Sequence, residues 1–174
     1  LSTFDLRPDD SGTKIIAALY TAAERGVQVQ ILIDGIYQKL FLEKSPVFQA
    51  LAAHQNIEVG IYNPVTNLMR LNYRMHDKYL IIDESMYLLG GRNTNDIFLG
   101  DKKTRINVDR DIFVYEETQG KGESLQALEK YFDTIWNEAQ VRKKKKTYAA
   151  SYEEKYKSEY HQLKERYRSL KEKY

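Results

Sequence analysis

The chain has 174 residues, a formal net charge of +2 and no cysteine. This length suits one domain with a substantial core better than two. The near-neutral charge argues for neither a nucleic acid nor an acidic partner. The lack of cysteine excludes disulfides and thiolate metal sites and permits a reducing, cytosolic location. No apolar run approaches the roughly 20 residues that span a bilayer. Because the chain starts at Leu1 rather than methionine, we expect an excised segment of a longer parent.

Residues 1–141 alternate between strand and helix patterns. Short runs with period-two alternation or continuous apolar character predict strands, and apolar residues at spacings of three and four predict helices. Alternation at these lengths predicts an α/β fold, with helices on both faces of a sheet. The expected strands span 2–6, 27–34, 57–63, 78–83, 86–91 and 110–116, and the expected helices span 13–25, 45–54 and 123–137.

The composition changes abruptly after Val141. A basic run, 142–146, opens a highly charged segment in which aromatic and leucine residues step by three or four, which predicts one striped helix. We expect a catalytic domain at 1–141 and a helical linker or assembly segment at 142–174, whose stripe packs on the domain or on another helix. Interspersed acidic residues count against a membrane-surface role. The stripe consists of Tyr148, Tyr152, Tyr156, Tyr160, Leu163, Tyr167, Leu170 and Tyr174.

One motif carries the chemistry, with the pattern H-x-K-x4-D-x6-G-G-x-N. Six fixed positions at set spacing arise by chance in a chain of this length only about a few times per million. A lone histidine or a lone glycine pair would instead indicate an ordinary structural residue or a turn. The six positions are His76, Lys78, Asp83, Gly90, Gly91 and Asn93.

The strand period predicts how these residues meet. His76 and Lys78 are two apart, so both side chains leave the same face of an extended segment. Asn93 follows the neighbouring strand and reaches the same end of the sheet if the two strands pair. Lysine supplies a compact positive charge for a phosphate oxygen, and asparagine supplies a neutral hydrogen bond. Gly90 and Gly91 let the backbone approach a ligand or a neighbouring strand closely. Asp83 has the opposite parity, which favours a structural role.

These residues resemble the H-K-D signature of the phospholipase D superfamily, and the Gly-Gly-x-Asn variant is most similar to its cardiolipin synthase-like bacterial branch. The resemblance covers most of residues 1–141 and implies an α-β-α sandwich with a mixed sheet. Further similar words occur in the family's order, namely "AAERGVQVQILIDG" (22–35), "YNP" (62–64), "LNYRMHDK" (71–78), "DRDIFV" (109–114) and "YFDTIWN" (131–137).

The chain departs from the two-motif members in holding a single motif. His54 and His161 lack a lysine two residues later. The extended catalytic unit of the family has two halves, each giving one H-K-D motif to a shared site, whereas small nuclease-like members pair as homodimers. We favour the interpretation that residues 1–174 are the N-terminal half of a two-motif enzyme.

The resemblance implies phosphodiester transfer through a covalent phosphohistidine, without metal or other cofactor. Lys78 and Asn93 would stabilise charge on the phosphoryl oxygens. A carboxylate would fix the tautomer of His76; Asp111 matches the family's orienting carboxylate best, and Asp109 on the same strand face is the competing choice. Arg74 beside the motif is expected to steer an anionic substrate.

Three functions compete at this point. The first is a phosphatidyltransferase or phospholipase D acting on an anionic phospholipid such as phosphatidylglycerol, in a bacterial parent associated with the cytoplasmic membrane, while this chain itself is soluble. The second is a homodimeric endonuclease or phosphodiesterase. The only dense basic run lies outside the catalytic half, which counts against nucleic acid. The third is a non-catalytic module.

Overall fold

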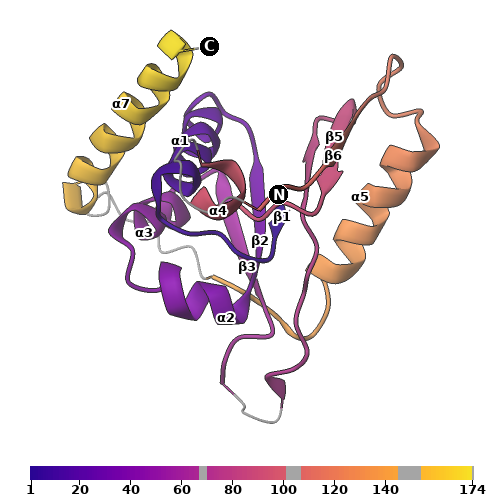
Figure 1. Cartoon of the computed structure of the whole chain (residues 1–174), viewed down its shortest axis with the longest axis horizontal. Coiled ribbons are helices and arrows are strands. Elements are labelled where there is room, and N and C mark those ends of the chain that lie inside the picture. Colours follow the sequence, from indigo (N-terminus) through magenta and orange to yellow (C-terminus); the bar gives the residue numbers. More distant parts are fainter. Residues whose placement is uncertain (67–69, 101–106, 145–153, 174) are drawn as a thin grey trace.

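The computed structural model describes residues 1–66, 70–100, 107–144 and 154–173 (Figure 1). Its core is a seven-stranded sheet with the order β6-β5-β4-β1-β2-β3-β7. Strands β1, β2 and β3 run parallel, and the remaining neighbours pair antiparallel, so the sheet is mixed as predicted. The strands are β1 (Ser2–Thr3), β2 (Val29–Asp34), β3 (Ile57–Tyr62), β4 (Tyr79–Ile82), β5 (Met86–Gly90), β6 (Asp111–Tyr115) and β7 (Val141–Lys143).

Helices cover both faces of the sheet, which confirms the α-β-α sandwich. One face carries α1 (Asp10–Glu24), α3 (Pro46–Ala53) and α7 (Lys157–Lys173), and α5 (Glu123–Trp136) lies on the other (Figure 1). Asp9 caps α1 by accepting a hydrogen bond from the Gly12 amide at 2.9 Å. Short helical turns follow two strands: α2 (Gly35–Tyr37) with a π-helical turn, η1 (Gln38–Leu42), and α4 (Asp96–Leu99).

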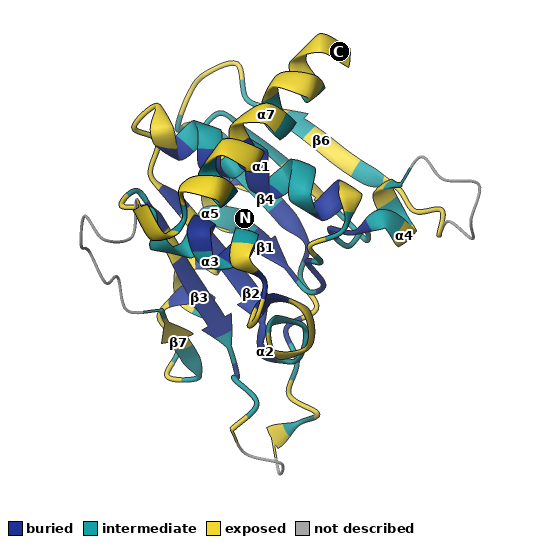
Figure 2. Ribbon diagram, turned by 90° about the vertical axis from the view of Figure 1, so that its left-hand side faces the viewer, coloured by how far each residue is buried: buried dark blue, intermediate teal, exposed yellow. Residues whose placement is uncertain are grey.

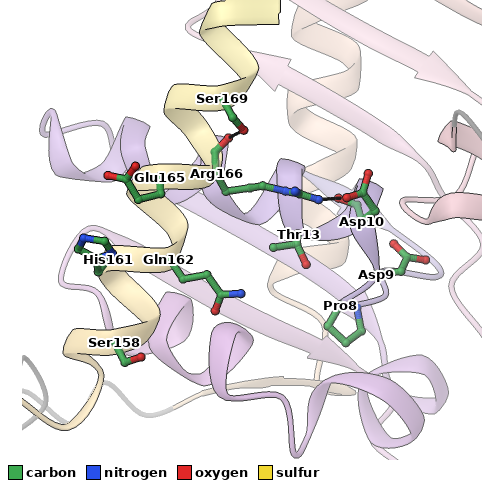
Figure 3. A pocket seen from close by; sticks show the side chains of 10 residues that line it. All are labelled: Pro8, Asp9, Asp10, Thr13, Ser158, His161, Gln162, Glu165, Arg166 and Ser169. Atoms are coloured by element: carbon green, nitrogen blue, oxygen red, sulfur yellow. Dashed lines mark hydrogen bonds and ion pairs between the residues drawn. The ribbon is translucent and has the colours of Figure 1, made fainter.

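The C-terminal helix α7 packs on the domain. Leu163 is fully buried in the core formed with α1, α3, β2 and β3, and the Tyr160 ring stacks on Tyr20 at a centroid distance of 5.1 Å. Arg166 pairs with Asp10 across a hollow of about 800 Å³ between α7 and the start of α1 (Figure 3). Tyr160, Leu163 and Tyr167 of the stripe therefore face the domain. Tyr148, Tyr152 and Tyr174 lie outside the described residues.

Two strands differ from the sequence prediction. Strand β1 is shorter than 2–6, because the chain leaves the sheet after Thr3 and runs beside Thr94, whose amide donates to the Asp5 carbonyl at 2.9 Å. Strand β7 pairs with β3 and spans the predicted boundary at residue 141. The pattern did not reveal β7, since only Val141 packs against the core while Arg142 and Lys143 are exposed.

Candidate functional site

His76 and Lys78 are in direct contact where the chain enters β4. The Lys78 Nζ atom lies 3.1 Å from His76 Nδ1 and donates a hydrogen bond to the His76 carbonyl at 2.6 Å. An ammonium group has no acceptor, so Nδ1 accepts this contact and the ring proton of a neutral His76 is assigned to Nε2. His76 is exposed, whereas Lys78 is only 8% exposed.

Lys78 is a cation held out of water. Burial lowers the pKa of its ammonium group, and the carboxylates of Asp77, Asp109 and Asp5 partly offset that effect. Within the described ranges, no carboxylate forms an ion pair with Lys78. A desolvated cation without a directly paired carboxylate attracts an anionic ligand strongly, because the surrounding dielectric is low.

Asn93 stands just past β5, the antiparallel neighbour of β4. The backbone pair that joins the strands near the site is the Gly90 amide donating to the Lys78 carbonyl at 3.2 Å. The Asn93 Oδ1 atom is buried and makes no hydrogen bond to any residue that the structure describes. A buried amide oxygen without a donor costs free energy. Asn93 is therefore a polar group that still lacks a partner, at the end of the strand next to Lys78.

Gly90 and Gly91 make room for two carboxylates. A methyl group on Gly90 would collide with the Asp111 carboxylate, and one on Gly91 would collide with that of Asp109. Asp111 pairs with Arg92 at 2.9 Å. Among the described contacts, neither carboxylate hydrogen-bonds to His76, so the choice of an orienting carboxylate remains a prediction.

Asp83 lies in a turn away from the motif histidine and lysine, and Arg74 is bonded to neighbouring residues of the domain. Asp83 is exposed in the β4–β5 hairpin turn with a φ of 47°, at the opposite end of β4 from Lys78. The Arg74 side chain is 13% exposed, lies 3.4 Å from the Asp34 carboxylate, and donates to the Asn63 carbonyl at 3.1 Å. These contacts tie Arg74 to a loop, and its part in substrate steering remains a prediction.

Sequence reasoning missed two buried carboxylates that hold this region. Asp34, fully buried at the end of β2, accepts from the Met75 amide at 3.1 Å and so anchors the segment that enters the motif. Burial raises the pKa of Asp34, and hydrogen bonds together with Arg74 oppose that rise. The sequence signal that could have revealed Asp34 is an acidic residue at the end of an apolar strand.

Asp5 is the second missed carboxylate. It accepts a hydrogen bond from Asn95 Nδ2 at 2.8 Å and pairs with Arg7 at 2.7 Å. These contacts join the segment after β1 to the residues that follow Asn93. No local pattern predicts the bond to Asn95, because the two residues are far apart in the sequence.

The family of the chain follows from this fold and motif together with a family comparison. The family model described as "Cardiolipin synthase, PLD-like domain" matches residues 1–136, and the chain belongs to this family of phospholipase D-like domains.

The individual relatives agree with this family assignment. The chain is 33% identical to "Cardiolipin synthase C" of Escherichia coli (strain K12), over 60% of this chain and 24% of the relative. It is 35% identical to "Cardiolipin synthase" of Clostridium perfringens (strain SM101 / Type A), over 76% of this chain and 27% of the relative. It is 34% identical to "Cardiolipin synthase 1" of Staphylococcus epidermidis (strain ATCC 12228 / FDA PCI 1200), over 78% of this chain and 26% of the relative. The chain thus spans about a quarter of the length of these relatives.

Within the described part of the chain, no helix combines the length and the hydrophobicity needed to cross a bilayer.

Proposed function

We propose that this chain supplies one half of a phospholipid phosphodiester-transfer site, of the kind used by a cardiolipin synthase-like phosphatidyltransferase or a phospholipase D. The observation that carries the proposal is the contact between the exposed His76 and the buried Lys78, with Nζ and Nδ1 3.1 Å apart. An imidazole beside a desolvated ammonium suits phosphodiester transfer, since the cation binds the anion on which the imidazole acts as nucleophile or as proton donor.

The reaction has two balanced steps. One histidine attacks phosphorus, a phosphorus–nitrogen bond forms, and the bond to the departing alkoxide breaks as a second imidazole donates a proton to the alkoxide. That second imidazole then removes a proton from the incoming alcohol or water, whose oxygen displaces the histidine. Lys78 and the Asn93 amide stabilise the phosphoryl oxygens throughout. His76 fills one of the two imidazole roles, and its counterpart in the second half fills the other.

A second half is required because this chain has one motif. Three features are consistent with it: the Asn93 Oδ1 atom lacks a donor among the described residues, the chain spans about a quarter of its relatives' length, and one face of the sheet is open at strands β4 to β6. That face, between β4 and β6, exposes Ile82, Leu88, Phe113 and Tyr115 at 39–62%. Apolar strands this exposed mark a covered interface in the assembled protein, and the face continues to Asp111, which pairs in register with Gly90.

The direct test uses the assembled enzyme, in which residues 1–174 are joined to a second H-K-D half. Labelled phosphatidylglycerol and other phospholipids are incubated with it, and the products are identified. The proposal predicts transfer to an alcohol acceptor or hydrolysis, with a labelled phosphohistidine trapped by rapid quenching. Chelators should leave the rate unchanged, and loss of activity that a divalent cation restores would reject the metal-free mechanism.

A homodimeric single-motif phosphodiesterase is the second candidate, favoured by the open apolar face on a chain with one motif. It predicts activity that rises with the square of the chain concentration and cleavage of nucleic acid. The first proposal predicts that added second half, and not added copies of this chain, restores turnover.

A further inference from the structure

Phe4 lies immediately after β1 and contacts both the imidazole and the ammonium group of the motif. The centroids of the Phe4 and His76 rings are 4.5 Å apart, with the planes inclined at 58°. The Lys78 Nζ atom lies 5.3 Å from the centroid of the same ring. A single aromatic side chain, distant from the motif in the sequence, therefore contacts the imidazole and the ammonium at once.

The Phe4 ring is itself held firmly. Tyr37 of α2 meets it edge-on at a centroid distance of 4.6 Å and an angle of 65°. Its backbone is fixed on both sides, since Thr3 belongs to the sheet and the Asp5 carboxylate is 2% exposed and bonded to Arg7 and Asn95. A ring with neighbours on each side loses little freedom when it supports a ligand site.

An aromatic face attracts cations because its quadrupole places negative potential above the ring. Lys78 has a long flexible stem, yet three groups limit its position: the Phe4 ring, the His76 carbonyl and His76 Nδ1. The same ring limits rotation of the exposed imidazole. Without the ring, both side chains keep their chemistry but sample more rotamers, which weakens the joint geometry that a phosphate needs.

We propose that Phe4 is a positioning residue that holds His76 and Lys78 in the geometry that receives the phosphoryl group. This inference rests on the proposed phosphodiester-transfer function and adds to it a residue outside the motif. Phe4 does not touch the reacting atoms; it acts through the two side chains that do.

The test compares Phe4→Leu with Phe4→Tyr in this chain, and inorganic phosphate is the probe. Phosphate affinity is measured by calorimetry, and the shift of the His76 ring protons is followed by NMR. Phe4→Leu should weaken phosphate binding about tenfold, the scale of one lost cation–π contact, while Phe4→Tyr should stay within about twofold because the ring remains. Phe113→Leu is the matched control on the exposed strand β6 and should leave affinity unchanged.

A structural role alone would lower stability without changing the pattern of phosphate binding. A folded Phe4→Leu chain that binds phosphate as tightly as wild type would therefore overturn the inference. In the assembled enzyme, a positioning role predicts that Phe4→Leu lowers kcat more than it raises KM, and that Phe4→Tyr restores kcat.

The experiment stays decisive if Phe4→Leu fails to fold. In the wild-type chain, nuclear Overhauser contacts should join the Phe4 ring protons to both the His76 ring and the Lys78 ε-methylene, and their absence would reject the inference. Failure of the proposed function looks different, since wild type and His76→Ala would then bind phosphate equally poorly, which overturns both proposals. Tight binding by wild type with no loss in folded Phe4→Leu removes only the role of Phe4.

Discussion

The centre of the sheet and its β6 edge differ sharply in how they are covered. Strands β2 and β3 are buried on both faces, with Ile31, Leu32 and Ile33 fully buried, whereas β6 at the far edge leaves Ile112 64% and Phe113 62% exposed. Figure 2 shows this as dark blue central strands beside a largely exposed β6. The central strands form a self-sufficient scaffold. The outer strands carry apolar residues as a core does, but no helix of the described chain covers Ile112 or Phe113.

The motif lies at the border between these two regions. Lys78 enters β4, which pairs with β1 at a single residue on one side and along its whole length with β5 on the other. The covered region thus supplies rigid anchors such as Asp34. The open region leads to Asn93, whose amide oxygen lacks a donor in the described structure. Under the proposed function, a second half supplies both the cover of this face and the donor to Asn93.

The largest expected effect tests whether His76 is part of the chemistry. His76→Ala in the assembled enzyme should lower turnover by about three or more orders of magnitude, as removal of a covalent nucleophile or its acid partner does. Steady-state rates on labelled phospholipid measure it. His161→Ala on the exposed face of α7 is the matched control and should stay within about twofold. A His76→Ala variant within tenfold of wild type would count against the site.

The free energy of unfolding tests the contrast between the covered region and the exposed β6 edge. Leu163 is fully buried between α7 and the domain, so Leu163→Ala should lower the free energy of unfolding by about 2–5 kcal/mol. Phe113→Ala on β6 should change it by less than about 0.5 kcal/mol in this chain, since the ring is exposed. Denaturant titration measures both. Equal losses would erase the contrast between the two regions.

Lys78→Met tests the buried cation while keeping the apolar stem. The variant should lower turnover of the assembled enzyme about a hundredfold, because a preorganised charge on the phosphoryl oxygens is lost. Lys171→Met on exposed α7 serves as the control and should behave as wild type. A Lys78→Met enzyme with an unchanged rate would show that the cation does not serve the reaction.

The smallest expected effect is a pair of opposite pH dependences. Burial lowers the pKa of Lys78 below the ordinary 10.5, so the ammonium loses its proton earlier in the folded chain than in the unfolded one. Phosphate affinity should therefore fall as pH rises through the lowered pKa. The contribution of Lys78 to stability should rise over the same range, since the unfolded state binds more protons there.

Calorimetric phosphate titrations and denaturation curves at several alkaline pH values measure these two trends. Lys78→Arg keeps its charge throughout this range and should flatten both trends. Parallel rather than opposite trends in the wild-type chain would contradict the assignment to Lys78.

The limits of prediction from the sequence follow from the range of the interactions. The contact between His76 and Lys78 was predictable, because parity along an extended segment is local. The anchoring of Met75 by Asp34 and the support of His76 by Phe4 join residues far apart in the chain, and no local pattern encodes such contacts. Strand β7 was hidden since basic side chains on its exposed positions mask a backbone that pairs with β3.

The most direct test of the half-site is the phospholipid turnover of this chain in a sample shown to be monomeric by analytical ultracentrifugation. We expect negligible turnover by the monomer, and turnover that appears in proportion to added second half and vanishes with His76→Ala. Robust turnover by the monomer alone, unaffected by His76→Ala, would contradict this expectation.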